Sequence, residues 1–192
     1  MGLATVGPQS PGEAPPLVRS KFADVTSAEV LIDAFGRVRE GVHWAVEGLS
    51  EVQLAARLDD AANSVAWLCW HLSRVQDDHL AHAFGTEQVW PAFHEAFGLP
   101  FGVLETGYGH SSRQVAQVRV ASGDLLTGYH DAVHEETLRL VSGLTDADLP
   151  RIVDERWNPP VTLGVRLVSV ISDGLQHAGQ AAFVRGILLR QG

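Results

Sequence analysis

The chain has few of the residues on which several classes of protein depend. It contains a single cysteine, Cys69, so an internal disulfide and a disulfide-based secreted fold are both excluded. Of its 14 basic residues only Lys21 is a lysine, and no cluster of Lys and Arg matches a run of phosphates. With a formal net charge of −9, this composition argues against nucleic acid as a partner.

Long apolar runs are also missing. No stretch approaches the roughly 20 apolar residues that span a bilayer, and no basic segment followed by an apolar core opens the chain. We therefore expect no membrane partner and a cytoplasmic location. The position of Cys69 between Leu68 and Trp70 predicts a buried thiol rather than a nucleophile.

The 192 residues, 45% of them apolar, suit one domain with a substantial core. Residues 1–20 are rich in proline and glycine, which predicts a flexible N-terminal tail. The remaining residues, 21–192, are expected to form a single domain.

Apolar spacing within that domain predicts four long helices. Thr26 and Glu29 form a capping box, and Leu31, Phe35 and Val38 then begin a series at intervals of four and three. The helices predicted in this way cover residues 27–49, 64–84, 123–141 and 162–184. Short helical turns are indicated after Ser50 and over residues 111–118.

Residues 85–123 lack such a pattern and contain Pro91, Pro100 and several glycines. A connector this long is typical of a crossover, which lets the third helix start at the end where the second began. The predicted fold class is therefore all-α, an up-down-down-up four-helix bundle with a long crossover between the second and third helices.

Three polar side chains interrupt the apolar faces of two predicted helices. Asp173 and His177 lie four residues apart, so they can aim at one point about 6 Å along the helix. His71 lies among Trp67 and Leu68 on the second helix. We hypothesise that the two helices face each other around one divalent ion bound by His71, Asp173 and His177.

Simpler interpretations of the same residues stay open. A lone histidine on an apolar face is more often a hydrogen-bonded core residue, and an acid four residues before a histidine is a common surface pair. Burying an unpaired carboxylate is costly, however. Asp173 therefore needs a cation, a buried partner or a position tilted toward solvent.

A rival metal pair occurs on the third predicted helix, where His130 and His134 form an H-x-x-x-H pattern. Asp131, Glu135 and Glu136 surround this pair, which indicates a solvated face and favours a titrating surface pair.

Together these motifs resemble the DinB/YfiT-like superfamily of metal-binding four-helix bundles. The resemblance rests on the turn at residues 48–50, the W-L-x-W-H-L core at residues 67–72 and the segment 173–180. The superfamily includes metal-dependent hydrolases, a mycothiol-dependent maleylpyruvate isomerase and thiol S-transferases. The resemblance implies metal ligation by His71, Asp173 and His177, although the first ligand of the last helix is usually His or Glu rather than Asp.

Two imidazoles and one carboxylate leave positions open on a metal, of which zinc or nickel is expected first and iron or manganese is possible. An ion of this kind can acidify a bound water or hold a thiol as thiolate. The resemblance favours a small-molecule thiol such as mycothiol, transferred to an electrophile, and implies a homodimer. A metal-dependent hydrolase and a non-catalytic, metal-stabilised helical protein are the alternatives.

Further residues are candidates for supporting the site or binding substrate. Arg166, two turns before Asp173, could hold a cofactor, although a surface arginine is the commoner case. The remaining candidates are Arg74, Asp78, His79, Tyr108, His110 and Gln180. Trp67, Trp70 and Trp157 are expected to fill the core.

Overall fold

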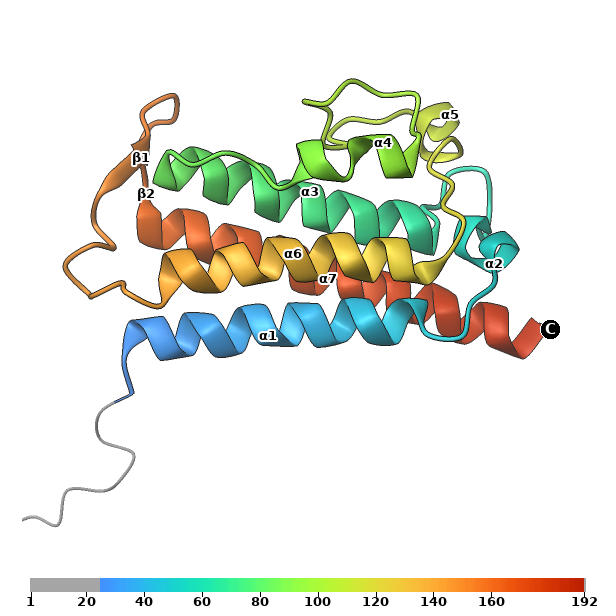
Figure 1. Ribbon diagram of the computed structural model, residues 1–192, viewed down its shortest axis with the longest axis horizontal. Coiled ribbons are helices and arrows are strands. Elements are labelled where there is room, and N and C mark those ends of the chain that lie inside the picture. The colour runs from blue at the N-terminus through green and yellow to red at the C-terminus, as the bar shows by residue number, and fades with distance from the viewer. Residues whose placement is uncertain (1–24, 192) are drawn as a thin grey trace, which may run out of the picture.

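The computed structural model describes residues 25–191 and shows a bundle of four long helices (Figure 1). They are α1 (Ser27–Val46), α3 (Val65–Phe84), α6 (Gly123–Val141) and α7 (Leu163–Gln191). Helices α1 and α7 run in one direction and α3 and α6 in the other, which confirms the predicted up-down-down-up bundle. The predicted tail at residues 1–20 lies outside the described part of the chain.

The helix boundaries follow local capping chemistry. Thr26 and Glu29 form the predicted capping box at the start of α1. At the start of α3, the side chain of Ser64 accepts a hydrogen bond from the backbone N–H of Trp67. Gly85 ends α3 in the left-handed conformation. Helix α7 continues to Gln191, beyond the predicted end at residue 184.

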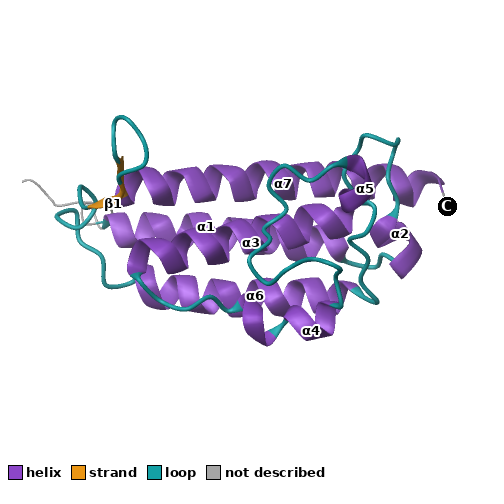
Figure 2. Cartoon of the chain, turned by 90° about the horizontal axis from the view of Figure 1, so that it is seen from above, coloured by secondary structure: helices purple, strands orange, loops and turns teal. Residues whose placement is uncertain are grey.

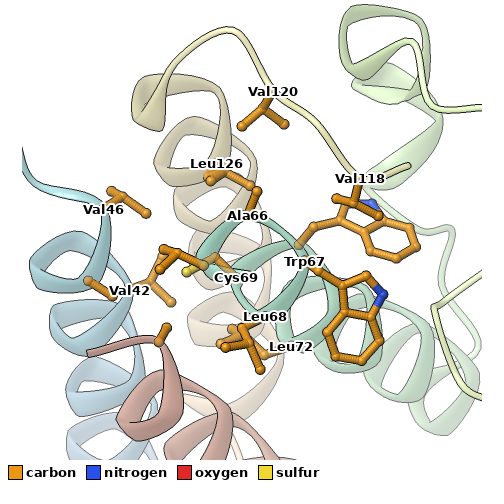
Figure 3. Packing of buried hydrophobic residues seen from close by; sticks show 14 of the residues in the cluster. Val42, Val46, Ala66, Trp67, Leu68, Cys69, Leu72, Val118, Val120 and Leu126 are labelled. Atoms are coloured by element: carbon orange, nitrogen blue, oxygen red, sulfur yellow. The ribbon is translucent and has the colours of Figure 1, made fainter. Parts of the chain in front are cut away.

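Each long helix packs against two neighbours, because α1 and α3 both contact α6 and α7. Figure 3 shows the largest part of the core, where α1, α3 and α6 bring aliphatic side chains around Cys69. Cys69 is buried as predicted, and the absence of nearby water raises the pKa of its thiol to about 12. This cysteine is therefore a core residue without nucleophilic character.

Trp67 and Trp70 are buried as expected, but the core assignment of Trp157 was wrong. Trp157 is 65% exposed and lies between β1 (Ile152–Asp154) and β2 (Val161–Thr162), two short antiparallel strands that the sequence did not predict. Apolar character alone could not distinguish a core tryptophan from one on an exposed hairpin.

The connector from α3 to α6 returns along the bundle and lies over α3 (Figure 2). It contains η1 (Trp90–Ala92), α4 (His94–Phe97) and α5 (Ser112–Val115), of which only the last was predicted. The predicted short helix after Ser50 is α2 (Glu51–Ala55).

Asp77 on α3 fixes the start of this connector. Its carboxylate is buried and accepts hydrogen bonds from the backbone N–H groups of Val89 and Trp90, each at 2.8 Å, and from the hydroxyl of Tyr129 at 2.9 Å. Each hydrogen-bond partner that the buried carboxylate of Asp77 lost would cost about 1–3 kcal/mol of stability. The connector is therefore held to α3 by satisfied buried polar groups rather than by apolar packing alone.

Among the described helices, none combines the length and the apolar character that crossing a membrane requires.

Candidate metal centre

Helix α3 presents His71 on its most buried side. The imidazole is 6% exposed and stacks on the indole of Trp67 one turn earlier, with ring centroids 4.5 Å apart and planes inclined by 20°. Spacing by four residues on one helix brings the two rings together. Stacking against a rigid indole restricts the ring orientation of His71.

A backbone carbonyl in the connector sets the tautomer of His71. The ring Nδ1 lies 2.6 Å from the carbonyl oxygen of Thr106, which can only accept, so Nδ1 carries the proton and donates. In the neutral ring the lone pair is therefore on Nε2. A histidine held in this way is typical of metal ligands, whose second nitrogen usually donates to a carbonyl or carboxylate.

Gly107 allows the connector to come this close. It has φ of +94°, and a Cβ at this position would lie 2.8 Å from Nδ1 of His71 and 2.9 Å from the ring of Trp70. Both the backbone conformation and the space exclude a side chain. The glycine at position 107 thus lets the backbone approach closely enough for the carbonyl of Thr106 to contact His71.

Helix α7 supplies the other two side chains. Asp173 and His177 are half-buried at the edge of the apolar stripe that includes Val170 and Val184, and Nε2 of His177 lies 3.5 Å from Oδ1 of Asp173. The opposite nitrogen of His177, Nδ1, donates to the side-chain oxygen of Gln180 at 2.9 Å. His177 and His71 therefore share the same arrangement, with Nδ1 hydrogen-bonded and Nε2 directed to the common centre.

The structure brings the three predicted ligands together. His71, Asp173 and His177 offer ligand atoms that all lie within 4.8 Å of one another, and the imidazoles of His71 and His177 have centroids 5.0 Å apart. Metal bonds of about 2.0–2.2 Å can join atoms spaced in this way with small side-chain movements. Within residues 25–191 no other group of three such side chains is found.

The unsatisfied polar atoms also fit a cation. Oδ2 of Asp173 is buried and has no hydrogen-bond partner among the described residues. Such an atom is costly unless a cation or donor reaches it. Asp173 is thus partly tilted toward solvent, with a side chain one-third exposed, while its buried Oδ2 is left for a cation or a donor.

The pKa values of His71 and His177 are shifted in opposite directions by their surroundings. Burial lowers the pKa of His71, with the hydrogen bond to Thr106 acting in the opposite direction. The hydrogen bond to Asp173 raises the pKa of His177. Both rings must be neutral to ligate, and the raised pKa of His177 makes its deprotonation more costly than that of His71.

Two of the other candidate residues, Arg74 and Asp78, organise the connector rather than the centre. Arg74 is fully buried and donates to the backbone oxygens of Glu105 and Val103, at 3.1 and 3.4 Å. Asp78 accepts from Gln88, which in turn accepts from Arg74. His79 is half-exposed beside Asp78. The ring of His71 is held by the carbonyl of Thr106 and not by Asp78 or His79.

His110 and Tyr108 lie in the same glycine-rich stretch but in opposite environments. The side chain of His110 is almost fully buried, and its Nδ1 accepts the indole N–H of Trp67 at 3.2 Å, so it steadies the ring on which His71 stacks. Tyr108 is 90% exposed.

Arg166 has a partner that the sequence did not reveal. Its guanidinium lies 2.9 Å from the buried carboxylate of Asp154 in β1, and its side chain is only 12% exposed. The expectation of an ordinary surface arginine was therefore wrong. Arg166 ties the start of α7 to the strand pair.

The solvated face expected for His130 and His134 was also wrong, because both imidazoles are buried. Ser73 donates its hydroxyl to the carbonyl of Cys69, so Nδ1 of His130 is the donor in its 2.9 Å bond to Ser73. Of the acidic neighbours, Glu135 is exposed, and Asp131 and Glu136 form ion pairs with Arg39 and Arg139, whereas both histidines are buried. Charge along the sequence did not reveal this difference.

The sequence analysis named Gln180 among the candidate supporting residues, but it did not identify the groups that orient His71. The carbonyl of Thr106, the indole N–H of Trp67 and the space left by Gly107 carry no residue-type signal. Only the glycine-rich composition of the connector indicated a special backbone there, whereas Gln180 was a candidate because it lies in the segment 173–180 that carries the family resemblance.

Comparisons with known proteins identify a family and a structural relative. Residues 30–189 match the family model described as mycothiol S-transferase. Among solved structures, a conserved protein from Enterococcus faecalis has a TM-score of 0.80 and 26% sequence identity, and the match covers 86% of this chain and 99% of that one. A search of curated proteins gave no significant match. With the family model covering most of the chain, this protein belongs to the mycothiol S-transferase family of DinB/YfiT-like helical bundles.

Proposed function

We propose that this protein is a divalent-metal-dependent S-transferase that joins mycothiol, or a closely similar small thiol, to an electrophile. The observation that carries the proposal is the convergence of His71, Asp173 and His177 within 4.8 Å in a chain of this family. Zinc or nickel suits the set of two nitrogens and one oxygen best. A cation held by these three side chains would favour the thiolate form of a thiol, which is the attacking form.

The protein's own residues prepare the site. Thr106 and Gln180 hold the two imidazoles with Nε2 directed to the centre, and Asp173 supplies a negative charge. In the transfer, the sulfur lone pair forms a new carbon–sulfur bond while a carbon–halogen bond breaks and halide leaves. With an epoxide, the carbon–oxygen bond opens and the oxygen takes a proton.

The chain's own cysteine does not compete for this role. Cys69 is buried, and the pKa of its thiol is raised to about 12, so little thiolate forms at neutral pH. The reacting sulfur must therefore come from a second molecule. A reducing cytoplasmic setting suits such a co-substrate.

A second candidate function follows from the placement of the ligands. One comes from α3 and two from α7, so a bound ion would cross-link neighbouring helices and could serve stability alone. In that case the protein would bind metal without catalysing any transfer.

One experiment separates these two functions. Purified protein is stripped with a chelator, reloaded with Zn²⁺ or Ni²⁺, and assayed with mycothiol and a panel of halides and epoxides while thermal unfolding is followed. The transferase hypothesis predicts turnover that disappears and returns with the metal. A melting temperature that depends on metal, with no turnover in the stripped or the reloaded protein, would instead support a purely stabilising role of the ion.

The homodimer implied by the family resemblance stays a prediction. Sedimentation velocity over a range of protein concentrations measures it directly.

A further inference from the structure

The outer face of α7 is apolar and carries no charge. Between residues 165 and 189, every exposed residue of this helix is neutral, and five of them are large apolar side chains that are 43–66% exposed. These five are Val165, Val168, Leu175, Phe183 and Leu189. By contrast, α1 and α6 expose acidic side chains such as Glu40 and Glu135. In a chain with a net charge of −9, a neutral apolar face of this length marks a contact surface.

The exposed positions of this face follow the spacing of helix–helix packing. Five of them are separated in turn by three, four, three and four residues, namely Val165, Val168, Ser172, Leu175 and Gly179. This spacing keeps one stripe of a helix directed at a second helix. Large and small side chains share the stripe, so the backbone of a second helix can approach closely at Ser172 and Gly179. The outer face of α7 therefore suits another α-helix.

A groove of about 580 Å³ lies on the same face, between α7 and the turn that precedes α3. Gly179, Gln180 and Phe183 line it from α7, and Asn63 lines it from the turn. The groove is thus on the C-terminal half of α7, whereas Val168 projects from the N-terminal half. A face with a projection on one side of its centre and a hollow on the other is complementary to a copy of itself turned about a two-fold axis.

A two-fold axis beside Leu175 satisfies this complementarity. In an antiparallel pair of α7 helices centred between residues 175 and 176, each residue faces the one equally far on the other side of the centre. Ser172 of one copy then lies opposite Gly179 of the other, and Val168 lies opposite Phe183. Small residues meet where the helices are closest, and apolar residues meet at the groove.

The size of the face is sufficient for a stable pair. At 1.5 Å per residue, the stretch from Val165 to Leu189 is about 36 Å long. A contact roughly 15–20 Å wide along it would bury about 500–700 Å² of each copy, close to the value of about 800 Å² for a standard interface.

We propose that the outer face of α7 is the interface of a two-fold symmetric homodimer in which the two α7 helices pack antiparallel. The family resemblance identifies no face, and the inference does not depend on the proposed transferase activity. Neutral faces let two copies of an acidic chain meet without opposing like charges, whereas a charged partner would find no counter-charge there. Gln180 lines the groove and accepts the hydrogen bond from His177, so the interface would adjoin the candidate metal centre.

Sedimentation velocity of the full chain over a wide range of concentrations tests the interface. Val168→Glu and Gly179→Glu should each raise the dissociation constant of the dimer at least about 100-fold, because the two-fold axis buries every new carboxylate twice without a partner. Gly128→Glu is the matched control and should dimerise like the wild type. Gly128 is also an exposed glycine inside a long helix, α6, and no atom lies within 4 Å of a Cβ at either glycine. Circular dichroism checks that all variants are folded.

Cysteine cross-linking tests the register of the two helices. Leu175→Cys places a thiol beside the two-fold axis, so a short bismaleimide should join two copies covalently. The native Cys69 adds no background, because it is buried and the pKa of its thiol is raised to about 12. Gly128→Cys is the control, and its chains should stay separate on a denaturing gel.

A dimer that persists unchanged in Val168→Glu and Gly179→Glu would overturn the inference, since the interface would then lie on another face. A wild type that stays monomeric at every concentration would also overturn it and leave the outer face of α7 to a different protein. None of these measurements uses turnover, so a failure of the transferase proposal would leave their outcome unaffected.

Discussion

The Nδ1–H of His71 donates to the carbonyl oxygen of Thr106 at 2.6 Å, so a residue of the connector orients a ligand on a helix 35 positions earlier. This contact joins the two parts of the protein that the sequence describes most differently, a regular apolar helix and a glycine-rich loop. The candidate metal centre therefore depends on the connector as well as on the bundle.

Gly107→Ala should weaken metal binding about 10–100-fold, the usual cost of losing a hydrogen bond that orients a ligand. The new Cβ would lie 2.8 Å from Nδ1 of His71 and displace the carbonyl of Thr106. Competition with a chromophoric chelator measures the affinity. Gly109→Ala is the matched control, because Gly109 also has a positive φ, +72°, but open space around it. Equal affinities of the two variants would refute this role of the connector.

His71→Ala and His177→Ala should each abolish stoichiometric metal binding, because each removes one of only two nitrogen donors. Asp173→Asn should weaken binding strongly, since the amide keeps the shape but loses the charge. Metal analysis after gel filtration measures the content. The double variant with His130→Gln and His134→Gln should retain its metal, and loss of metal there would revive the rival pair.

The buried His130 should make the domain less stable in acid. Its Nδ1 already donates to Ser73, and Nε2 has no partner, so protonation would bury a charge and an unpaired N–H. The pKa of His130 falls from 6.5 to about 3 for this reason. A depressed folded-state pKa of a base means that stability is complete above the unfolded pKa and is lost as the pH falls.

Between pH 6.5 and 3, this single group should remove about 1.4 kcal/mol of unfolding free energy per pH unit. His130→Gln cannot take up this proton, so its stability should decline less steeply over the same interval. Urea denaturation at several pH values measures both slopes. Parallel slopes would show that His130 is not the titrating group.

Cys69→Ala should leave transferase turnover unchanged, because the buried thiol with its raised pKa takes no part in the chemistry. The cost in stability should be about 1 kcal/mol, as for the removal of one buried heavy atom. In the wild type, iodoacetamide should label this cysteine only after unfolding. Labelling of the native protein, or loss of turnover in the variant, would contradict the assignment.

Much of the fold could be predicted from local patterns. The apolar series beginning at Leu31, the caps at Thr26 and Ser64, and the stop at Gly85 all act within a few residues, so the sequence contains the information directly. The spacing of Asp173 and His177 likewise follows from helix geometry. The long crossover predicted that α3 and α6 run in parallel.

The rest depends on contacts between distant segments. The sequence could not show that His130 points inward beside Ser73 while Asp131 faces Arg39, or that Trp157 stands on an exposed strand pair. Neighbouring residues of one helix can face opposite environments, and a difference of one position, 100° of rotation, decides which. Residue type alone does not fix that rotation when polar and apolar residues are mixed.

By itself, the sequence determined that this protein is an acidic bundle of four helices with three candidate metal ligands on two of them. Only the tertiary structure decided that those side chains meet and that the carbonyl of Thr106 and the oxygen of Gln180 fix their orientation. The physical reason is that helix formation is governed by interactions three and four residues apart. A ligand sphere, by contrast, requires atoms from separate segments to be placed within a few ångströms, which only the packing of the whole bundle achieves.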